Sequence, residues 1–297
     1  MDQIIKSEKL VVQSSGYLNG LLGVIIFSGS LPATKLAVND FGPIFLTTGR
    51  ASVAGFLALI VLLLNREKIP NMKQWISLSI VSLGVVIGFP LFSSLALQYI
   101  TSAHSIVYVG LLPLFTAIFA VVFGGELPKP IFWVFSILGS SLVVLYALIQ
   151  GVNSSLIGDL MMISAIILAG LGYAIGGKLS KVLGGWQVIS WSLVLSLPVM
   201  LFLSFVYKPN SIIDISISSW LGLAYLSFFS MFIGFIFWYK GLAQGGIASV
   251  GQLQLLQPFF GLALSALILK ENVGFGMILI VLGVILCVFG SKKFGSN

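Results

Sequence analysis

The polar side chains that could bind a ligand are few in this apolar chain, and several of them lie close together before Pro258. Gln252, Gln254 and Gln257 occupy one otherwise apolar stretch. An amide side chain facing hydrocarbon would lack hydrogen-bond partners, so we expect most of these to face protein or water. Two interpretations stay open. The amides line a cavity that binds a small polar molecule, or they join neighbouring helices by hydrogen bonds.

Arg50 is the only arginine within a long apolar segment. A charge near the centre of a membrane helix costs about 2.5–3.5 kcal/mol on insertion scales, and less toward the interface. Something must therefore pair with Arg50 or hydrate it. It either contacts an anionic group of a substrate in a cavity, or it pairs with Asp40 or with backbone carbonyls.

The only histidine, His104, precedes Tyr108 by four residues, so on a helix the two share a face. A histidine can change its charge near neutral pH, which would suit proton coupling. The alternative is a hydrogen-bonded structural histidine. Trp238 and Tyr239 could supply apolar walls of a small-molecule pocket.

Together these residues predict a substrate site near the middle of the membrane, between segments 100–123 and 247–269. The predicted substrate-binding residues are His104, Tyr108, Gln254, Gln257, Arg50, Gln252, Trp238 and Tyr239.

Enzymatic chemistry finds little support in the sequence. There is one histidine and one cysteine, Cys287, and there is no P-loop, H-E-x-x-H motif or pair of aspartates within apolar segments. We therefore predict no catalytic residues, no metal site and no cofactor. A non-transport intramembrane enzyme remains a minor alternative.

Composition dictates the environment of the elements that carry these residues. Hydrophobic residues make up 58% of the chain and charged residues 8%, with a mean hydropathy of +1.13. A soluble domain has about 25% charged residues, so this chain must be solvated by the lipid bilayer. The net charge of +7 does not indicate nucleic-acid binding, because the Lys and Arg residues form no basic stripe.

The apolar runs predict an all-α membrane protein with ten transmembrane helices, since a span needs roughly 20 apolar residues. No segment alternates apolar and polar residues as a β-strand would. The predicted spans are 17–38, 42–64, 74–95, 100–123, 130–149, 156–177, 187–207, 219–239, 247–269 and 273–290.

Lys and Arg in the short loops predict the orientation, because they concentrate on the cytoplasmic side. With the N-terminus inside, the cytoplasmic residues are Lys6, Lys9, Arg66, Lys68, Lys73, Lys129, Lys178, Lys181, Lys240, Lys292 and Lys293. The outer residues are Lys35, Lys208 and Lys270. We therefore expect a multi-pass protein of the inner (plasma) membrane with both termini in the cytoplasm.

The chain also contains a repeat with an offset of 145 residues. Pro113 and Glu126 in segment 96–126 then coincide with Pro258 and Glu271 in segment 241–271. The predicted units are residues 1–150 and 151–297, each with five helices. An odd number of spans per unit inverts the second copy, as in many secondary transporters. We expect both glutamates, at helix ends, to lie at the membrane interface.

The paired prolines interrupt their helices at equivalent places. Pro113 and Pro258 leave the carbonyls of Val109 and Gln254 without their helical donors. Such carbonyls are tolerated in a membrane where protein or a water-filled cavity serves them. The prolines are therefore either hinges beside a central site or ordinary packing kinks. Three glycine-rich stretches, 84–88, 172–176 and 241–245, predict close helix packing.

Several motifs in this order resemble an EamA-type member of the drug/metabolite transporter superfamily. They are Ser28-Gly-Ser-Leu-Pro-Ala-Thr-Lys35, Phe41-Gly-Pro43, Thr48-Gly-Arg50, Leu112-Pro113-Leu-Phe115, Gly125-Glu126, Gln257-Pro258-Phe and Lys270-Glu271. The family often has tryptophan early in the first helix, where this chain has Phe27. The resemblance implies two inverted five-helix repeats, alternating access, and a central pocket lined by helices 1, 3, 4, 6, 8 and 9.

The predicted function is secondary transport of a small metabolite by alternating access, with export of amino acids or related metabolites preferred. Movement of drugs or nucleotide sugars is the alternative. We expect the partners to be a small-molecule substrate and the bilayer, with proton or ion coupling possible and a monomer or homodimer as the assembly.

Overall fold

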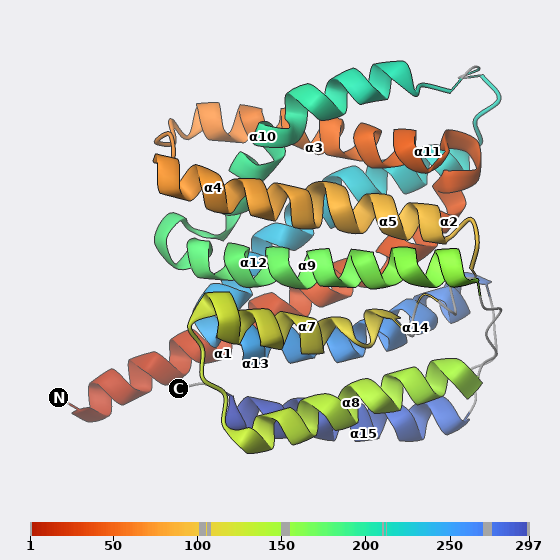
Figure 1. The fold of residues 1–297 in the computed structure, drawn as a ribbon. Helices are drawn as coiled ribbons and strands as arrows, with labels where there is room; N and C mark the ends of the chain where they lie inside the picture. Colours follow the sequence, from red (N-terminus) through yellow and green to blue (C-terminus); the bar gives the residue numbers. More distant parts are fainter. Residues whose placement is uncertain are drawn as a thin grey trace.

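The protein is a bundle of long helices that run side by side across the molecule (Figure 1). The computed structural model describes residues 2–100, 105, 108–149, 155–209, 211, 213–269 and 275–295. These described residues form helices and short connections, with no β-strand among them. The prediction of an all-α protein is confirmed for this part of the chain.

The first half of the described chain contains nine helical elements. They are α1 (Asp2–Ser28), α2 (Ser30–Phe41), α3 (Pro43–Leu64), α4 (Met72–Val81), the π-helix η1 (Ser82–Gly88), α5 (Phe89–Ala96), α7 (Leu112–Phe119), the π-helix η2 (Ala120–Gly124) and α8 (Pro130–Ile149).

The second half contains another nine. They are α9 (Leu156–Leu183), α10 (Gly185–Val206), α11 (Ile217–Ala224), the π-helix η3 (Tyr225–Ile233), α12 (Gly234–Gly245), α13 (Ile247–Gly251), the 3₁₀-helix η4 (Gln252–Leu256), α14 (Gln257–Leu269) and α15 (Phe275–Phe294).

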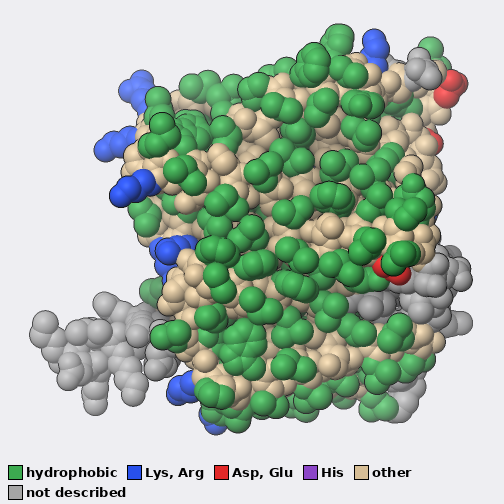
Figure 2. Space-filling model, viewed as in Figure 1, with side chains coloured by type: hydrophobic (Ala, Val, Ile, Leu, Met, Phe, Trp, Pro, Cys, Tyr) green, Lys and Arg blue, Asp and Glu red, His purple; other side chains and the backbone are tan. Residues whose placement is uncertain are grey.

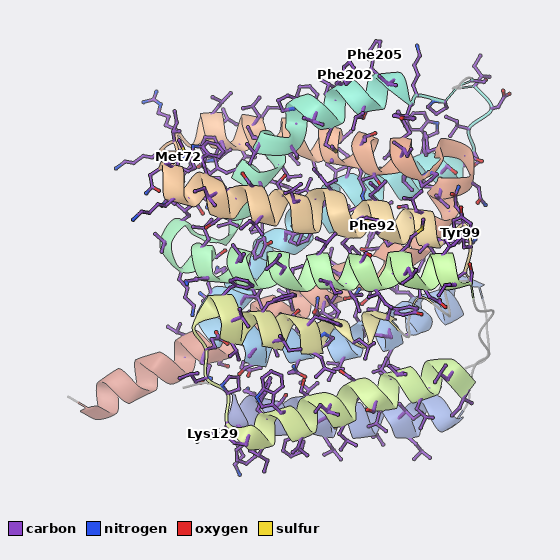
Figure 3. All side chains as sticks on the ribbon, viewed as in Figure 1. Met72, Phe92, Tyr99, Lys129, Phe202 and Phe205 are labelled. Atoms are coloured by element: carbon purple, nitrogen blue, oxygen red, sulfur yellow. The ribbon has the colours of Figure 1, made fainter. Side chains whose placement is uncertain are left out.

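Six helical segments of the described chain are long and apolar enough to cross a bilayer, and two shorter apolar helices accompany them. The six are Val11–Phe41, Pro43–Leu64, Met72–Ala96, Leu156–Leu183, Gly185–Val206 and Ile217–Gly245. Their outer faces carry large apolar side chains, as Figure 2 shows over most of the visible surface. Phe202 and Phe205 project outward from α10 in this way (Figure 3). A surface of this kind requires lipid.

The two ends of the bundle differ in charge. Both chain termini lie at the same end (Figure 1). Most Lys and Arg side chains visible in Figure 2 also gather there. This Lys-rich end includes Lys129 before α8 (Figure 3), Lys178 and Lys181 in the last part of α9, and Lys292 in α15. Lys208, after α10, belongs to the opposite end.

The packing between helices repeats when the two halves of the chain are exchanged. Numbered by the ten spans that the sequence predicts, span 1 (α1) packs on span 8 (α12), and span 3 (η1 and α5) packs on span 6 (α9). Span 2 (α3) packs on span 7 (α10), and span 5 (α8) packs on span 10 (α15). This pattern is expected when a two-fold axis relates the halves.

Glycines allow the closest of these contacts, as the glycine-rich stretches predicted. A Cβ on Gly241 of α12 would lie 2.5 Å from the backbone nitrogen of Gly20 in α1. A Cβ on Gly84 of η1 would lie 2.6 Å from the carbonyl oxygen of Leu168 in α9. Both distances are too short for a side chain, so backbone meets backbone at these positions.

Candidate functional site

A cavity of about 30 Å³ lies inside the bundle, among helices from both halves. This volume has room for ordered water but not for a metabolite. Its polar lining comes from α2, α3, α5, η3 and α14, and consists of Ser30, Thr34, Arg50, Ser93, Ser230 and Gln257.

The cavity lies where regular helices are interrupted. Gly29 separates α1 from α2, and α7 and α14 begin next to Pro113 and Pro258. The π-helices η1 and η3 supply further lining residues, Val85 and Ser230. Irregular backbone is tolerated at membrane depth where it lines a cavity or is buried in protein. The interruptions at both prolines agree with the sequence prediction, while their role as hinges stays a prediction.

A cause can be given for one of the two π-helices at the cavity. Pro90 is the second residue after η1 and has no N–H, and its ring would clash with the carbonyl four residues earlier in a regular α-helix. In the wider turn the N–H of Phe89 bonds to the carbonyl of Gly84. In η3 the N–H of Gly234 bonds in the same way to the carbonyl of Phe229, without a proline nearby.

Arg50 on α3 lines the cavity and is only 5% exposed. Among the residues that the structure describes, its guanidinium has no acidic partner, and its Nε has no hydrogen-bond acceptor. Asp40 is engaged elsewhere. Its Oδ2 accepts hydrogen bonds from the hydroxyls of Ser216 (2.6 Å) and Ser219 (2.8 Å). Arg50 therefore does not pair with Asp40, and that part of the second interpretation is wrong, while pairing with backbone carbonyls stays a prediction.

Hydroxyl and amide groups from opposite halves meet around the cavity. The hydroxyl oxygens of Ser30 in α2 and Ser230 in η3 are 2.7 Å apart and hydrogen-bonded. The Gln257 amide nitrogen donates to the carbonyl of Phe27 at 3.5 Å, a long bond. These groups are neutral, and each can donate or accept a hydrogen bond.

Aromatic rings form the apolar wall. Phe27 packs on Phe235 with 4.9 Å between ring centroids, and Tyr173 packs on Phe235 at 6.0 Å. Phe89 completes the set of rings that line the cavity. Phe27 stands where the resembled family often has tryptophan, so the difference lies in the cavity wall.

The predicted site residues divide into three groups. Arg50 and Gln257 line the cavity. Trp238, Tyr239, Gln252 and Gln254 are fully buried in the surrounding core and are not part of its lining.

Gln252 and Gln254 are notable because the described residues offer their amide groups no hydrogen-bond partner of good geometry. The Gln254 side chain lies beside the Tyr173 hydroxyl, so it reaches the cavity wall only indirectly.

Tyr108 and His104 form the third group. Tyr108 is half-buried and its hydroxyl interacts with Asp159 near the start of α9. It is therefore not placed among the cavity residues. His104 lies outside the described residues, and its role stays a prediction.

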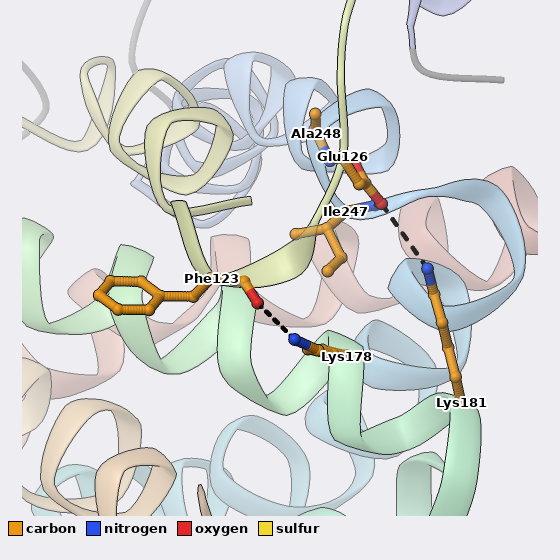
Figure 4. Close-up of polar contacts among 6 residues, drawn as sticks. All are labelled: Phe123, Glu126, Lys178, Lys181, Ile247 and Ala248. Atoms are coloured by element: carbon orange, nitrogen blue, oxygen red, sulfur yellow. Dashed lines mark hydrogen bonds and ion pairs between the residues drawn. The ribbon is translucent and has the colours of Figure 1, made fainter. Parts of the chain in front are cut away.

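Glu126 has partners that the sequence did not predict. Its side chain is 6% exposed and caps α13, while its expected place at the membrane interface stays a prediction. Its carboxylate accepts the backbone N–H of Ile247 at 2.7 Å and of Ala248 at 2.8 Å (Figure 4). Unpaired N–H groups at a helix start attract a carboxylate. Glu271 lies outside the described residues.

Two lysines of α9 contact the segment around Glu126 at the Lys-rich end. Lys181 Nζ lies 3.8 Å from a Glu126 oxygen, and Lys178 Nζ donates to the Phe123 carbonyl at 2.8 Å (Figure 4). Three parts of the chain, η2, α9 and α13, are thus joined at this end.

Sequence reasoning missed the serines, Thr34 and most of the aromatic rings of the lining. The repeat carries a signal for some of them. Val85 and Ser230, Pro90 and Phe235, and Leu112 and Gln257 each differ by 145 residues, the offset of the repeat, and all six line the cavity. Pairing Gln257 with its repeat equivalent would have pointed to the centre of the molecule.

The site offers no metal-binding set. Within the described part of the chain, no group of three or more His, Cys, Asp or Glu side chains could hold a metal ion. The arrangement is that of a multi-span helical membrane protein with a cavity between its halves.

Comparison with known proteins identifies the family. The profile of the EamA-like transporter family matches the chain twice, over residues 14–148 and 156–291. The chain therefore belongs to this family and is a membrane transporter. The prediction made from the sequence motifs is confirmed.

Two bacterial relatives and one solved structure agree with this assignment. The chain is 59% identical to the uncharacterized transporter YdeK of Bacillus subtilis (strain 168), over 95% of this chain and 98% of that protein. It is 25% identical to YyaM, another uncharacterized transporter of the same strain, over 89% and 91%. A solved crystal structure shares the fold with a TM-score of 0.76 at 16% identity, covering 94% of this chain and 98% of the other.

Proposed function

We propose that this protein is a secondary transporter that exports amino acids or related small metabolites by alternating access. The observation that carries the proposal is the cavity at the junction of interrupted helices, with Arg50 and Gln257 in its lining. Binding sites of secondary transporters commonly lie where discontinuous helices meet between repeats.

The proposed topology has ten membrane-spanning helices arranged as two inverted five-helix repeats. The exchange of packing partners between the halves supports it, as do the matching positions of η1 and η3 in their spans. The lysine bias between the two ends supports a plasma-membrane orientation with both termini in the cytoplasm.

Alternating access requires that one end of the bundle opens while the other closes. In the described conformation Glu126 and the two lysines of α9 join η2, α9 and α13 at the Lys-rich end. We propose that these contacts close the cytoplasmic side and break when that side opens. Coupling to a proton or another ion, and assembly as a monomer or a homodimer, remain part of the proposal.

The test is transport by purified protein in sealed vesicles. Vesicles loaded with radiolabelled amino acids should lose them faster with the protein than without it, and an excess of unlabelled substrate outside should exchange with the label. The matched control is the Gln257→Leu variant at equal protein content. A protein that moves no member of the amino-acid set refutes the amino-acid proposal, and movement of drugs or nucleotide sugars supports the alternative.

A further inference from the structure

The charge of the cavity lining determines which substrates fit it. Arg50 is the only ionisable side chain of full charge among the described lining residues; the others are hydroxyl, amide, aromatic and aliphatic groups. We propose that the cavity binds the carboxylate of a small organic acid with an apolar body, apolar amino acids included, and that Arg50 is the carboxylate-binding residue. This inference rests on the proposed transport function and names its substrate class.

The first argument is that none of the described acidic residues supplies a counter-charge to Arg50. The whole chain has eight Asp and Glu residues. The five whose side chains are described lie away from the cavity: Asp40, Glu67, Glu126, Asp159 and Asp214. Asp40, Glu67 and Glu126 have hydrogen-bond partners elsewhere, Asp159 interacts with Tyr108, and Asp214 is exposed. None of them neutralises Arg50.

The second argument is the burial of Arg50. A charge that is 5% exposed cannot be hydrated by bulk water, and a cavity of 30 Å³ can hold only a small amount of ordered water. A buried, unpaired charge is costly, and a ligand anion that replaces this water removes the cost. The described Ser30 and Thr34 hydroxyls can donate further hydrogen bonds to the same anion.

The third argument separates a carboxylate from other anions. A planar guanidinium can donate two parallel hydrogen bonds to one carboxylate, which balances its charge. A phosphate dianion would need a second cation, and the described lining supplies Arg50 alone. A cationic drug would face Arg50 without any compensating carboxylate, so cations should be excluded.

The fourth argument concerns the remainder of the ligand. Phe27, Phe89, Tyr173 and Phe235 come from four different helices and form an apolar wall beside Arg50. Such rings suit an aliphatic or aromatic body, and their faces can accept the ammonium group of an amino acid. A strongly polar body, such as a nucleotide sugar, would leave its hydroxyls facing these rings.

The experiment measures binding to the purified protein with ligands that carry different charges on similar apolar bodies. The probes are 3-phenylpropanoate and 3-phenylpropanamide, 4-methylpentanoate and 4-methylpentanamide, phenylalanine, phenethylammonium and phenyl phosphate. Binding is measured by isothermal titration calorimetry in detergent. We expect each carboxylate to bind about 10- to 100-fold more tightly than its amide, as for a hydrogen bond to a charged group.

Two variants assign this preference to Arg50. Arg50→Gln should bind acid and amide equally, whereas Lys35→Gln, which removes a charge from an exposed position on the neighbouring α2, should keep the wild-type preference. Arg50→Lys should keep part of it, because the charge remains while the paired donors are lost. A preference that survives in Arg50→Gln overturns the assignment.

Wild-type protein alone also tests the proposal, in case Arg50→Gln does not fold. The carboxylate site is overturned if wild-type protein binds amides, phenethylammonium or phenyl phosphate as tightly as carboxylates. It is also overturned if the protein binds no acid more tightly than the matching amide. Vesicle transport separates the two levels. Transport of a neutral or cationic metabolite refutes the carboxylate site but keeps the proposed transport function. Tight binding of an acid that is never transported keeps the carboxylate site but refutes the proposed transport function.

Discussion

Neutralising Glu126 should loosen the Lys-rich end of the protein. The carboxylate accepts the N–H groups of Ile247 and Ala248 at 2.7 and 2.8 Å and is almost fully buried. In Glu126→Gln one amide oxygen remains as an acceptor, and the charge that complements the start of α13 is lost. Losing one charged hydrogen bond and weakening the other costs about 2–4 kcal/mol. The contact to Lys181 adds little, because that lysine is 45% exposed.

This cost falls on the closed conformation, since the contact exists only while η2 and α13 stay together. A destabilisation of about 2–4 kcal/mol raises the population of states open at this end about 30- to 800-fold. The assay is labelling of an introduced cysteine, Ala248→Cys, by a water-soluble maleimide. Ala248 is fully buried here. The native Cys287 is itself buried and is replaced by serine.

The control is Glu67→Gln. Glu67 accepts one hydrogen bond from Gln187 in a less buried place, so its neutralisation should leave the labelling rate near that of the parent. Equal labelling rates in the Glu126→Gln and Glu67→Gln proteins would refute the reasoning. A loss of thermal stability without faster labelling would mean that the carboxylate supports folding and not closure.

Three further outcomes are expected. Gln257→Leu should reduce substrate efflux from vesicles at least about tenfold, because a polar lining group is lost. The detergent-extracted variant should keep the elution profile of the wild-type protein. Unchanged efflux would show that Gln257 is not part of the site. Gly241→Val should lower the yield of folded protein and cost over about 3 kcal/mol by forcing α12 away from Gly20, whereas a stable variant would show that this contact can yield. Alkaline-phosphatase fusions at Asn297 and beside Lys68 should be inactive, as expected for cytoplasmic positions, and activity at either position contradicts the topology.

Span positions and helix breaks were accessible from the sequence because they depend on local composition. Apolar length fixes where a helix can cross a bilayer, and a proline fixes where a helical hydrogen bond is missing. Pro113 and Pro258 therefore marked the beginnings of α7 and α14 correctly. The π-helix η3 carried no such mark, because its apolar sequence would also suit a regular α-helix.

The direction in which a polar side chain faces was much harder to predict. Arg50 and Gln257 were recognisable because a charge or an amide in an apolar helix demands a partner. Serines give no such signal, since a serine hydroxyl can bond to a carbonyl of its own helix. Ser52 does so with Thr48, whereas Ser30 bonds across the cavity to Ser230.

Glu126 shows the same limit for acidic residues. Nothing local in the sequence marks it as a buried acid that caps a distant helix. Its partners, the N–H groups of Ile247 and Ala248, are more than a hundred residues away in sequence. Only the tertiary arrangement of η2 and α13 brings them together.

The π-helices η1 and η3 give the two central spans a property that a proline kink lacks. A π-helical turn holds one residue more than an α-helical turn, and it shifts the backbone hydrogen bonds from the i→i+4 to the i→i+5 pattern at one place in the helix. When the π-helical turn moves along the helix by one residue, the residue that it passes rotates by about 100° and shifts by about 1.5 Å, while the flanking helix stays intact. Ser230 lies inside η3 and Val85 inside η1. Migration of a π-helical turn along either span would therefore rotate a lining residue such as Ser230 or Val85 without bending the span.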